Sequence, residues 1–260
     1  MPQPVRIGIA GALGRMGRAI AAGLEGRPDA VVALGFDRPG TEGQPWRDGQ
    51  LRSAEDVGGC DVVVDFTTPA ASVALARAAA ARGGPALVIG STGWGEHEDD
   101  EIRAAAASVP IVKSGNYSLG VNVMAGLVRQ AAARLSAQDW DVEVFEAHHK
   151  RKVDAPSGTA LGLGEVIAKT LGRDLSKCAV YGREGVTGER DPSTIGFATV
   201  RGGDIVGDHT VLFAGTGERI EITHKASSRA TFALGALRAA RFLKGNPPGL
   251  YDMQDVLGLK

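Results

Sequence analysis

The sequence predicts an α/β fold of two domains, a parallel sheet covered by helices and a smaller α+β domain with a mixed or antiparallel sheet. Three observations predict it. Short apolar runs alternate with helix-like segments in the first half, a glycine-rich turn follows the first run, and period-two alternation returns late in the chain. A chain of 260 residues is long enough for two domains of roughly 100 to 150 residues. We expect one domain from residues 1–118 and 229–260, and the other from residues 119–228.

The first domain is predicted from its alternating elements. Apolar runs at residues 5–10, 30–36, 62–66, 86–89 and 111–112 are expected strands, and residues 69–82 and 96–108 are expected helices. This alternation is typical of a Rossmann-like parallel sheet with helices on its faces. Ligands of such sheets bind at the carboxyl ends of the strands, where the strand order reverses. The loops after the strands are therefore the candidate binding site.

The glycine-rich turn after the first strand favours a dinucleotide. Gly11, Gly14 and Gly17 follow a GxxGxxG spacing rather than GxGxxG, and the turn opens a helix whose free N–H groups suit a pyrophosphate. Asp37 ends the second run about 20 residues later, where an acid accepts ribose hydroxyls, and Arg38 can pair with the extra phosphate of NADP. Alternatively, the glycines only allow tight packing and Asp37 is a turn residue. The order strand, loop, helix and acid favours nucleotide binding and leaves NADH versus NADPH open.

Two further polar loops follow the fourth and fifth expected strands. They are residues 90–93, Gly-Ser-Thr-Gly, and residues 114–117, Ser-Gly-Asn-Tyr. Each alone is typical of an ordinary turn, but together they lie where the nicotinamide end of a cofactor would bind.

The second domain carries a local cluster of charge. Residues 146–159 contain His148, His149 and the three cations at 150–152, although 29 Lys and Arg balance 30 Asp and Glu over the whole chain. This pattern predicts a site for a small anion. An expected strand at residues 141–149 places Glu146 and His148 on one face and His149 on the other. A turn must follow if His148 and Lys152 share one substrate, because four extended residues span roughly 13 Å. The alternative is a solvated edge with unrelated charges.

A helix expected at residues 160–171 begins beside this cluster. Ser157 is the candidate N-cap, and the backbone N–H groups of Gly158 and Thr159 would face an anion, or simply begin a capped helix. Later runs at residues 196–201, 209–214 and 219–225 are predicted antiparallel strands, in which His209 is expected to be a hydrogen-bonded structural residue. Residues 229–243 are expected to form a helix that packs on the first domain, followed by a docking segment at residues 249–260.

Several classes of protein are disfavoured. The spacing of Cys60 and Cys178 fits neither zinc nor a disulfide framework. A net charge of -1 and the lack of interleaved aromatics argue against nucleic acid. No apolar run approaches the roughly 20 residues of a membrane span, and the N-terminal residues lack a secretion signal, so a cytoplasmic location is expected.

Motifs along the chain resemble the dihydrodipicolinate reductase family, also called 4-hydroxy-tetrahydrodipicolinate reductase. They are residues 11–17, 65–67, 90–93, 116–118, 146–149 and 152–159, with further likeness at 196–201, 221–228 and 251–253. The resemblance implies reduction of 4-hydroxy-tetrahydrodipicolinate, a cyclic dicarboxylate, in the diaminopimelate route to lysine. It also implies NADH or NADPH as cofactor and a homotetramer. Another nicotinamide-dependent dehydrogenase of small carboxylates and a non-catalytic nucleotide sensor are the alternatives.

The resemblance also assigns residues by motif. His148 and Lys152 are the proton-donor positions, and either one can deliver the proton. His149, Gly158 and Thr159 bind substrate, beside Ser157. The implied cofactor residues are Gly11, Ala12, Leu13, Gly14, Arg15, Met16, Asp37, Arg38, Gly90, Ser91, Thr92, Ser114, Gly115, Asn116 and Tyr117. Three features differ from many relatives: a shorter segment between Asp37 and Asp61, Ser91 in place of Thr, and Tyr117 in place of Phe.

Overall fold

The computed structural model describes residues 3–135, 138–228 and 230–260, and the chain divides into two compact units. The first unit contains Met1–Leu119 and Ala230–Lys260, and the second contains Gly120–Arg229. Arg229, at the expected domain boundary and the expected start of a helix, lies outside the described residues, as do Met1 and Pro2. Among the residues described, no helix is both long and apolar enough to span a membrane.

The first unit is built on a six-stranded parallel sheet in the order β13-β7-β6-β5-β1-β2. Its strands are β1 (Val5–Ala10), β2 (Ala30–Phe36), β5 (Val62–Asp65), β6 (Ala86–Ile89), β7 (Pro110–Lys113) and β13 (Gly249–Tyr251). Every residue of β5 and β6 is buried, because helices cover both faces of the sheet, and this explains their unbroken apolar runs. The predicted parallel sheet is confirmed. Strand order reverses between β1 and β5, which places the expected ligand crevice there.

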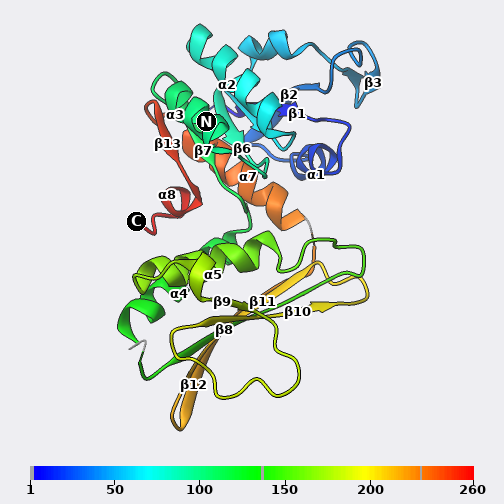
Figure 1. Ribbon diagram of the computed structural model, residues 1–260. Helices are drawn as coiled ribbons and strands as arrows, with labels where there is room; N and C mark the ends of the chain where they lie inside the picture. The colour runs from blue at the N-terminus through cyan, green and yellow to red at the C-terminus, as the bar shows by residue number, and fades with distance from the viewer. Residues whose placement is uncertain (1–2, 136–137, 229) are drawn as a thin grey trace. The chain divides into compact units, whose positions relative to one another are not determined.

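The helices of this unit form two layers. α1 (Arg15–Gly23), α7 (Ala230–Leu243) and α8 (Met253–Leu257) share one core cluster, and α2 (Pro69–Arg82) and α3 (Glu96–Ala106) share another. Figure 1 shows α7 beside α1. α2 has the predicted bounds, because Thr68 caps its start, Pro69 occupies its first turn and Gly83 ends it in the left-handed conformation. The sequence did not predict the short hairpin of β3 (Pro45–Trp46) and β4 (Gly49–Gln50) or the 3₁₀ helix η1 (Ala54–Gly59).

The second unit contains a five-stranded mixed sheet in the order β12-β11-β8-β10-β9. Its elements are β8 (Asp141–His148), β9 (Ala179–Tyr181), β10 (Ile195–Arg201), β11 (Gly207–Gly215), β12 (Glu218–Ala226), α4 (Leu119–Arg134), α5 (Gly158–Thr170) and α6 (Leu175–Cys178). Side chains of α4 and α5 share a core cluster with one face of the sheet. Val142, Val144, Glu146 and His148 lie on this face and are all buried, as the alternation of β8 predicted.

One prediction for this sheet is wrong. The three late runs were expected to be antiparallel, but β10 runs parallel to both β8 and β9. β8 lies between β10 and β11, and only β11 has antiparallel partners on both sides, β8 and β12. The reason lies in two connections: α5 carries the chain from the end of β8 back towards its beginning before β9, and residues 182–194 return it again before β10, so β9 and β10 run in the same direction as β8. The alternation of apolar and polar residues predicts which side chains share a face of a strand, but it does not predict which strands pair with it.

Candidate active site

A buried carboxylate lies at the centre of the second unit's polar cluster. Glu146 is 1% exposed and is surrounded by hydrogen-bond donors. The two guanidinium nitrogens of Arg201 contact its two oxygens at 2.8 Å each, His148 Nδ1 lies 2.6 Å from Oε2, and the Ser157 backbone N–H donates to Oε1 at 2.9 Å. Burial alone raises the pKa of Glu146, but the hydrogen bonds from Arg201, His148 and Ser157 outweigh it and lower the pKa to about 2. Glu146 is therefore an anion at pH 7.

The anion fixes the state of His148. Because ionised Glu146 only accepts hydrogen bonds, Nδ1 of His148 carries a hydrogen, and Nε2 is the nitrogen left for another partner. Gly207 leaves room beside it, since a Cβ there would lie 3.0 Å from Nε2. Burial lowers the pKa of His148 below 6.5 and outweighs the opposing effect of Glu146, while Lys152 and Arg201 lower it further. In the unliganded protein at pH 7 the imidazole is therefore mainly neutral.

The predicted turn after β8 is present. The Lys152 backbone N–H donates to the His149 carbonyl at 3.0 Å, and the His149 N–H donates to the Ile205 carbonyl at 2.8 Å. The Lys152 ammonium lies 2.7 Å from an Asp154 oxygen. Its charge lowers the pKa of His148.

The start of α5 belongs to the same cluster. Ser157 is the N-cap, as predicted, and its Oγ accepts from the Ala160 N–H at 3.2 Å. The same Oγ lies 3.1 Å from Nε2 of His209, whose ring is 5.1 Å from that of His148. Burial, helped by the nearby His148, lowers the pKa of His209 to about 4, so His209 is neutral at pH 7. His209 is hydrogen-bonded in the sheet, as predicted. Gly158 and Thr159 are the first two residues of the helix.

In the first unit, the predicted glycine loop is joined to the end of β2. Gly11 adopts a φ of +67°, which favours glycine. Asp37 Oδ2 accepts from the Leu13 N–H, and Oδ1 from the Arg38 N–H, each at 2.9 Å. Asp37 therefore holds the loop in place, in addition to the ribose contact expected of it.

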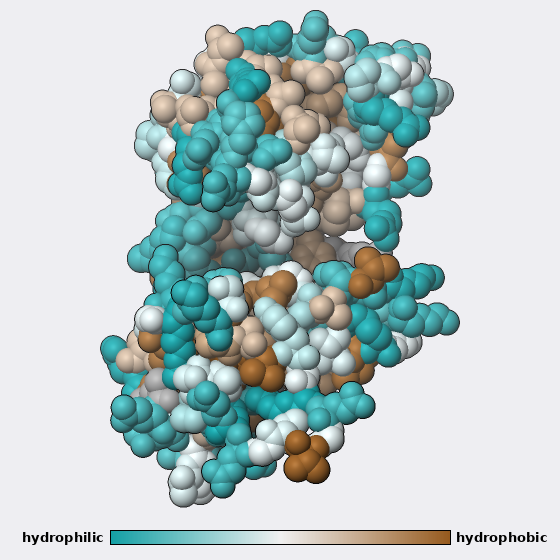
Figure 2. Space-filling view, in the orientation of Figure 1, coloured by the Kyte–Doolittle hydropathy of each residue, from teal (hydrophilic) through white to brown (hydrophobic). Residues whose placement is uncertain are grey.

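A cavity of about 570 Å³ lies where the strand order reverses. It is lined by residues that follow β1, β2 and β5, and by the alanine-rich side of α2, which appears as tan surface in Figure 2. Arg38 and Arg82 are its two lining cations. Arg82, in the last turn of α2, is held by a 3.0 Å hydrogen bond from Nη1 to the Glu55 carbonyl. The sequence reasoning did not include Arg82.

The loops after β6 and β7 meet at a second cavity of about 490 Å³. Ser91, Thr92, Ser114 and Gly115 are among its lining residues. Lys113 also lines it, with its ammonium paired to Asp99 and 4.1 Å from the centre of the Trp94 ring.

Two predicted cofactor residues direct their side chains into the protein. Ser91 is 4% exposed, and its Oγ lies 2.8 Å from that of Ser72, which in turn donates to Asp65 at 2.6 Å. Tyr117 is 1% exposed, and its hydroxyl lies 2.8 Å from the Ile89 carbonyl and 3.0 Å from that of Val112. These side chains are already bonded inside the first unit, so contact with a cofactor is left to their backbone atoms.

Comparison with known proteins identifies the family. Residues 5–117 match the family described as "Dihydrodipicolinate reductase, N-terminus", and residues 120–257 match "Dihydrodipicolinate reductase, C-terminus". This chain belongs to the dihydrodipicolinate reductase family.

Individual relatives agree with this assignment over the full length. The chain is 60% identical to 4-hydroxy-tetrahydrodipicolinate reductase of Caulobacter vibrioides, with 100% of each chain covered. It is 54% identical to the enzyme of that name from Thiobacillus denitrificans, over 98% of this chain and 99% of that one. A solved dipicolinate-bound dihydrodipicolinate reductase from Paenisporosarcina sp. TG-14 is 21% identical, has a TM-score of 0.78 and covers 97% of this chain and 98% of its own. The last comparison supports the fold.

For this member of the reductase family, sequence reasoning missed roles for Glu146 and Arg201. Glu146 was identifiable in principle, because it lies two residues before His148 in a strand and therefore on the same face. Arg201 was not, because it comes close only through the parallel pairing of β10 with β8, where it is opposite His148.

Proposed function

We propose that this chain catalyses the NAD(P)H-dependent reduction of 4-hydroxy-tetrahydrodipicolinate, via dihydrodipicolinate, to tetrahydrodipicolinate in the diaminopimelate route to lysine. The observation that carries the proposal is the polar cluster around Glu146 and His148 at the start of α5, in a chain whose relatives of that name match it end to end. A small cyclic dicarboxylate suits this cluster, because helix N–H groups and cationic side chains both favour anions.

In the proposed mechanism, the second unit binds the dicarboxylate and supplies the proton. The N–H groups of Gly158 and Thr159, together with His149, bind the carboxylates. Loss of water from 4-hydroxy-tetrahydrodipicolinate gives the conjugated imine of dihydrodipicolinate, and a nicotinamide cofactor, when bound, would supply the hydride that reduces it. His148 and Lys152 are the groups that protonate the electron-rich product of that addition. Because His148 is mainly neutral in the free protein, it donates a proton only after a bound dianion has favoured its imidazolium form.

The first unit binds the cofactor in this proposal. The glycine loop takes the pyrophosphate, and the cavity of about 570 Å³ takes the adenosine end. Arg38 and Arg82 give this cavity two guanidinium groups that suit a 2′-phosphate, while Asp37 lies beside them for a free ribose. We therefore propose that both NADPH and NADH are used. The backbones of residues 90–92 and 114–117 line the nicotinamide end.

A direct assay tests the function. Freshly prepared 4-hydroxy-tetrahydrodipicolinate is added to the protein with NADH or NADPH, and the absorbance of the reduced nicotinamide is followed. The proposal predicts a substrate-dependent loss of absorbance. Oxidation only with other small carboxylates would instead indicate a different dehydrogenase. Cofactor binding without any oxidation would indicate a nucleotide sensor.

We also propose a homotetramer, in which the open face of the second unit's sheet contacts another copy. Phe145 and Val200 are 41% and 42% exposed on this face, on neighbouring strands β8 and β10. Exposed apolar residues that lie close together on an uncovered sheet are typical of an interface. Light scattering on the purified protein tests this, and replacing Phe145 by Glu should give smaller species. A cytoplasmic location completes the proposal, since the reaction consumes a reduced nicotinamide nucleotide.

A further inference from the structure

We propose that Glu146 is a positioning residue for the reaction, whose carboxylate holds the His148 imidazole and the first turn of α5 in one fixed arrangement around the substrate. The inference rests on the proposed function, because it concerns how the same site is organised. Glu146 itself is buried and acts through its neighbours rather than on the substrate.

Two donors to Glu146 belong to the parts of the site that meet the substrate. His148 presents the reacting imidazole, and the Ser157 N–H begins the helix whose next N–H groups face the carboxylates. Both are bonded to the same carboxylate, at 2.6 and 2.9 Å, so the distance between imidazole and helix start is set by one side chain. Proton transfer requires such placement, since small displacements weaken it strongly.

Arg201 extends the arrangement to the loop before the helix. Its Nη1 and Nη2 contact both oxygens of Glu146, and Nη2 also donates to the Asp154 carbonyl at 2.6 Å. Since Lys152 is paired with the Asp154 side chain, both proposed proton donors are connected to the Glu146–Arg201 pair. The pairing of β10 with β8 places Arg201 opposite His148 and so makes the contact possible.

The charge of Glu146 matters as well as its geometry. Four side chains interact electrostatically with the His148 imidazole. They are Glu146 on the same strand, Arg201 on β10, His209 on β11 and Lys152 in the turn. Among these described groups Glu146 is the negative one, and its hydrogen bond and charge favour the imidazolium. His148 therefore becomes a proton donor with the help of this carboxylate and of a bound dianion.

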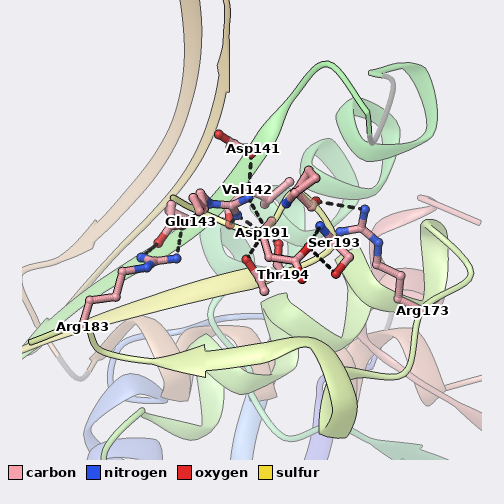
Figure 3. A network of polar contacts seen from close by, with 10 residues as sticks. Asp141, Val142, Glu143, Arg173, Arg183, Asp191, Ser193 and Thr194 are labelled. Carbon is pink, nitrogen blue, oxygen red and sulfur yellow. Dashed lines mark hydrogen bonds and ion pairs between the residues drawn. The ribbon is translucent and has the colours of Figure 1, made fainter. Parts of the chain in front are cut away.

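The chain provides a matched control. Glu143 lies three residues earlier on β8 and is also bound by arginines, at 2.9 and 2.8 Å by Arg183 and at 2.9 Å by Arg190 (Figure 3). It belongs to the opposite face of the strand and makes none of the contacts described above with His148 or Ser157. Removing its charge breaks a comparable ion-pair network away from the proposed site.

The test compares Glu146→Gln, Glu146→Asp and Glu143→Gln with the wild-type protein. Glu146→Gln should lower kcat by about 100-fold and raise KM for the dicarboxylate, while KM for NADH stays within about twofold. In the wild type, kcat/KM should decrease as the pH rises and His148 loses its proton. In Glu146→Gln this decrease should occur at lower pH, because His148 lacks the anion that favours its imidazolium form. Glu146→Asp keeps the charge, so this decrease should stay near the wild-type pH while kcat drops. Glu143→Gln should change none of these quantities.

The inference is overturned if Glu146→Gln has the kinetic constants and pH profile of Glu143→Gln. If Glu146→Gln does not fold, the kinetics of Glu146→Asp decide the question. A kcat and both KM values equal to those of the wild type would overturn the inference. A lower kcat with an unchanged KM for NADH would support it.

A measurement without turnover separates this inference from the proposed function. Nitrogen NMR of isotope-labelled histidine should find His148 protonated at Nδ1, and dipicolinate, used as the probe, should raise its pKa in the wild type more than in Glu146→Gln. An inactive wild-type protein would refute the proposed function, while this NMR result would still decide the role of Glu146. Protonation of His148 at Nε2 alone would overturn that role.

Discussion

Replacing Gly17 by alanine tests whether the glycine loop binds the cofactor. Gly17 lies in the first turn of α1, where a Cβ would be 2.3 Å from the Gly11 carbonyl oxygen and 2.8 Å from the Ala12 Cα. An ordinary contact begins near 3.4 Å, so loop and helix must separate by about 1 Å. Both neighbouring atoms belong to the backbone, so no change of side-chain rotamer can relieve the contact. The loop that presents N–H groups to a pyrophosphate is therefore displaced.

The size of the effect follows from this displacement. Overpacking of this kind costs about 1 to 3 kcal/mol of stability, partly offset by about 1 kcal/mol from the better helix propensity of alanine. Loss of one hydrogen bond to the charged pyrophosphate costs about 2 kcal/mol, which corresponds to a roughly 30-fold weaker Kd. We expect Gly17→Ala to bind NADH roughly 30-fold more weakly with only a modest loss of stability.

Gly23→Ala is the matched control, because Gly23 ends the same helix. A Cβ there meets only the flexible end of Leu237, at 3.4 Å. Fluorescence titration gives the Kd for NADH, and thermal unfolding gives the stability of each variant. If Gly17→Ala binds NADH as tightly as Gly23→Ala, the glycine loop is not the pyrophosphate site.

Three further predictions follow from single side chains. Arg82→Ala should raise KM for NADPH about tenfold and leave KM for NADH unchanged, because only a 2′-phosphate pairs with this guanidinium. Arg77 lies on the same helix but outside the cavity, so Arg77→Ala should change neither KM value. His209 has a pKa of about 4 in the folded protein against an ordinary value of 6.5, so the folded protein binds fewer protons than the unfolded chain between these values. The free energy of unfolding should fall by about 3 kcal/mol as pH drops from about 6.5 to about 4, and His209→Gln should remove that component in denaturant titrations. Tyr117→Phe leaves buried carbonyls without their hydroxyl partner and should cost about 1 to 3 kcal/mol; an unchanged melting temperature would contradict the role given to this hydroxyl.

The sequence was sufficient for features set by neighbours along the chain. The bounds of α2 follow from Thr68, Pro69 and Gly83, the cap of α5 follows from Ser157, and the buried face of β8 follows from its alternation. Each depends on local backbone geometry and on hydrogen bonds between nearby residues. The motifs of both halves were also sufficient to name the family.

Tertiary structure decided the features that join distant segments. β10 became the parallel neighbour of β8 because residues 182–194 return the chain after β9 and β10 pairs between β8 and β9, and this pairing brought Arg201 to Glu146 across 55 positions of sequence. Likewise, Tyr117 was assigned to a cofactor from its loop, but the fold buries its ring and bonds its hydroxyl to two strands. The sequence by itself determined which residues carry charge and which backbone conformation they favour. Strand pairing and burial determined which of those groups meet, because contacts between distant segments depend on the packing of the whole unit and not on any local pattern.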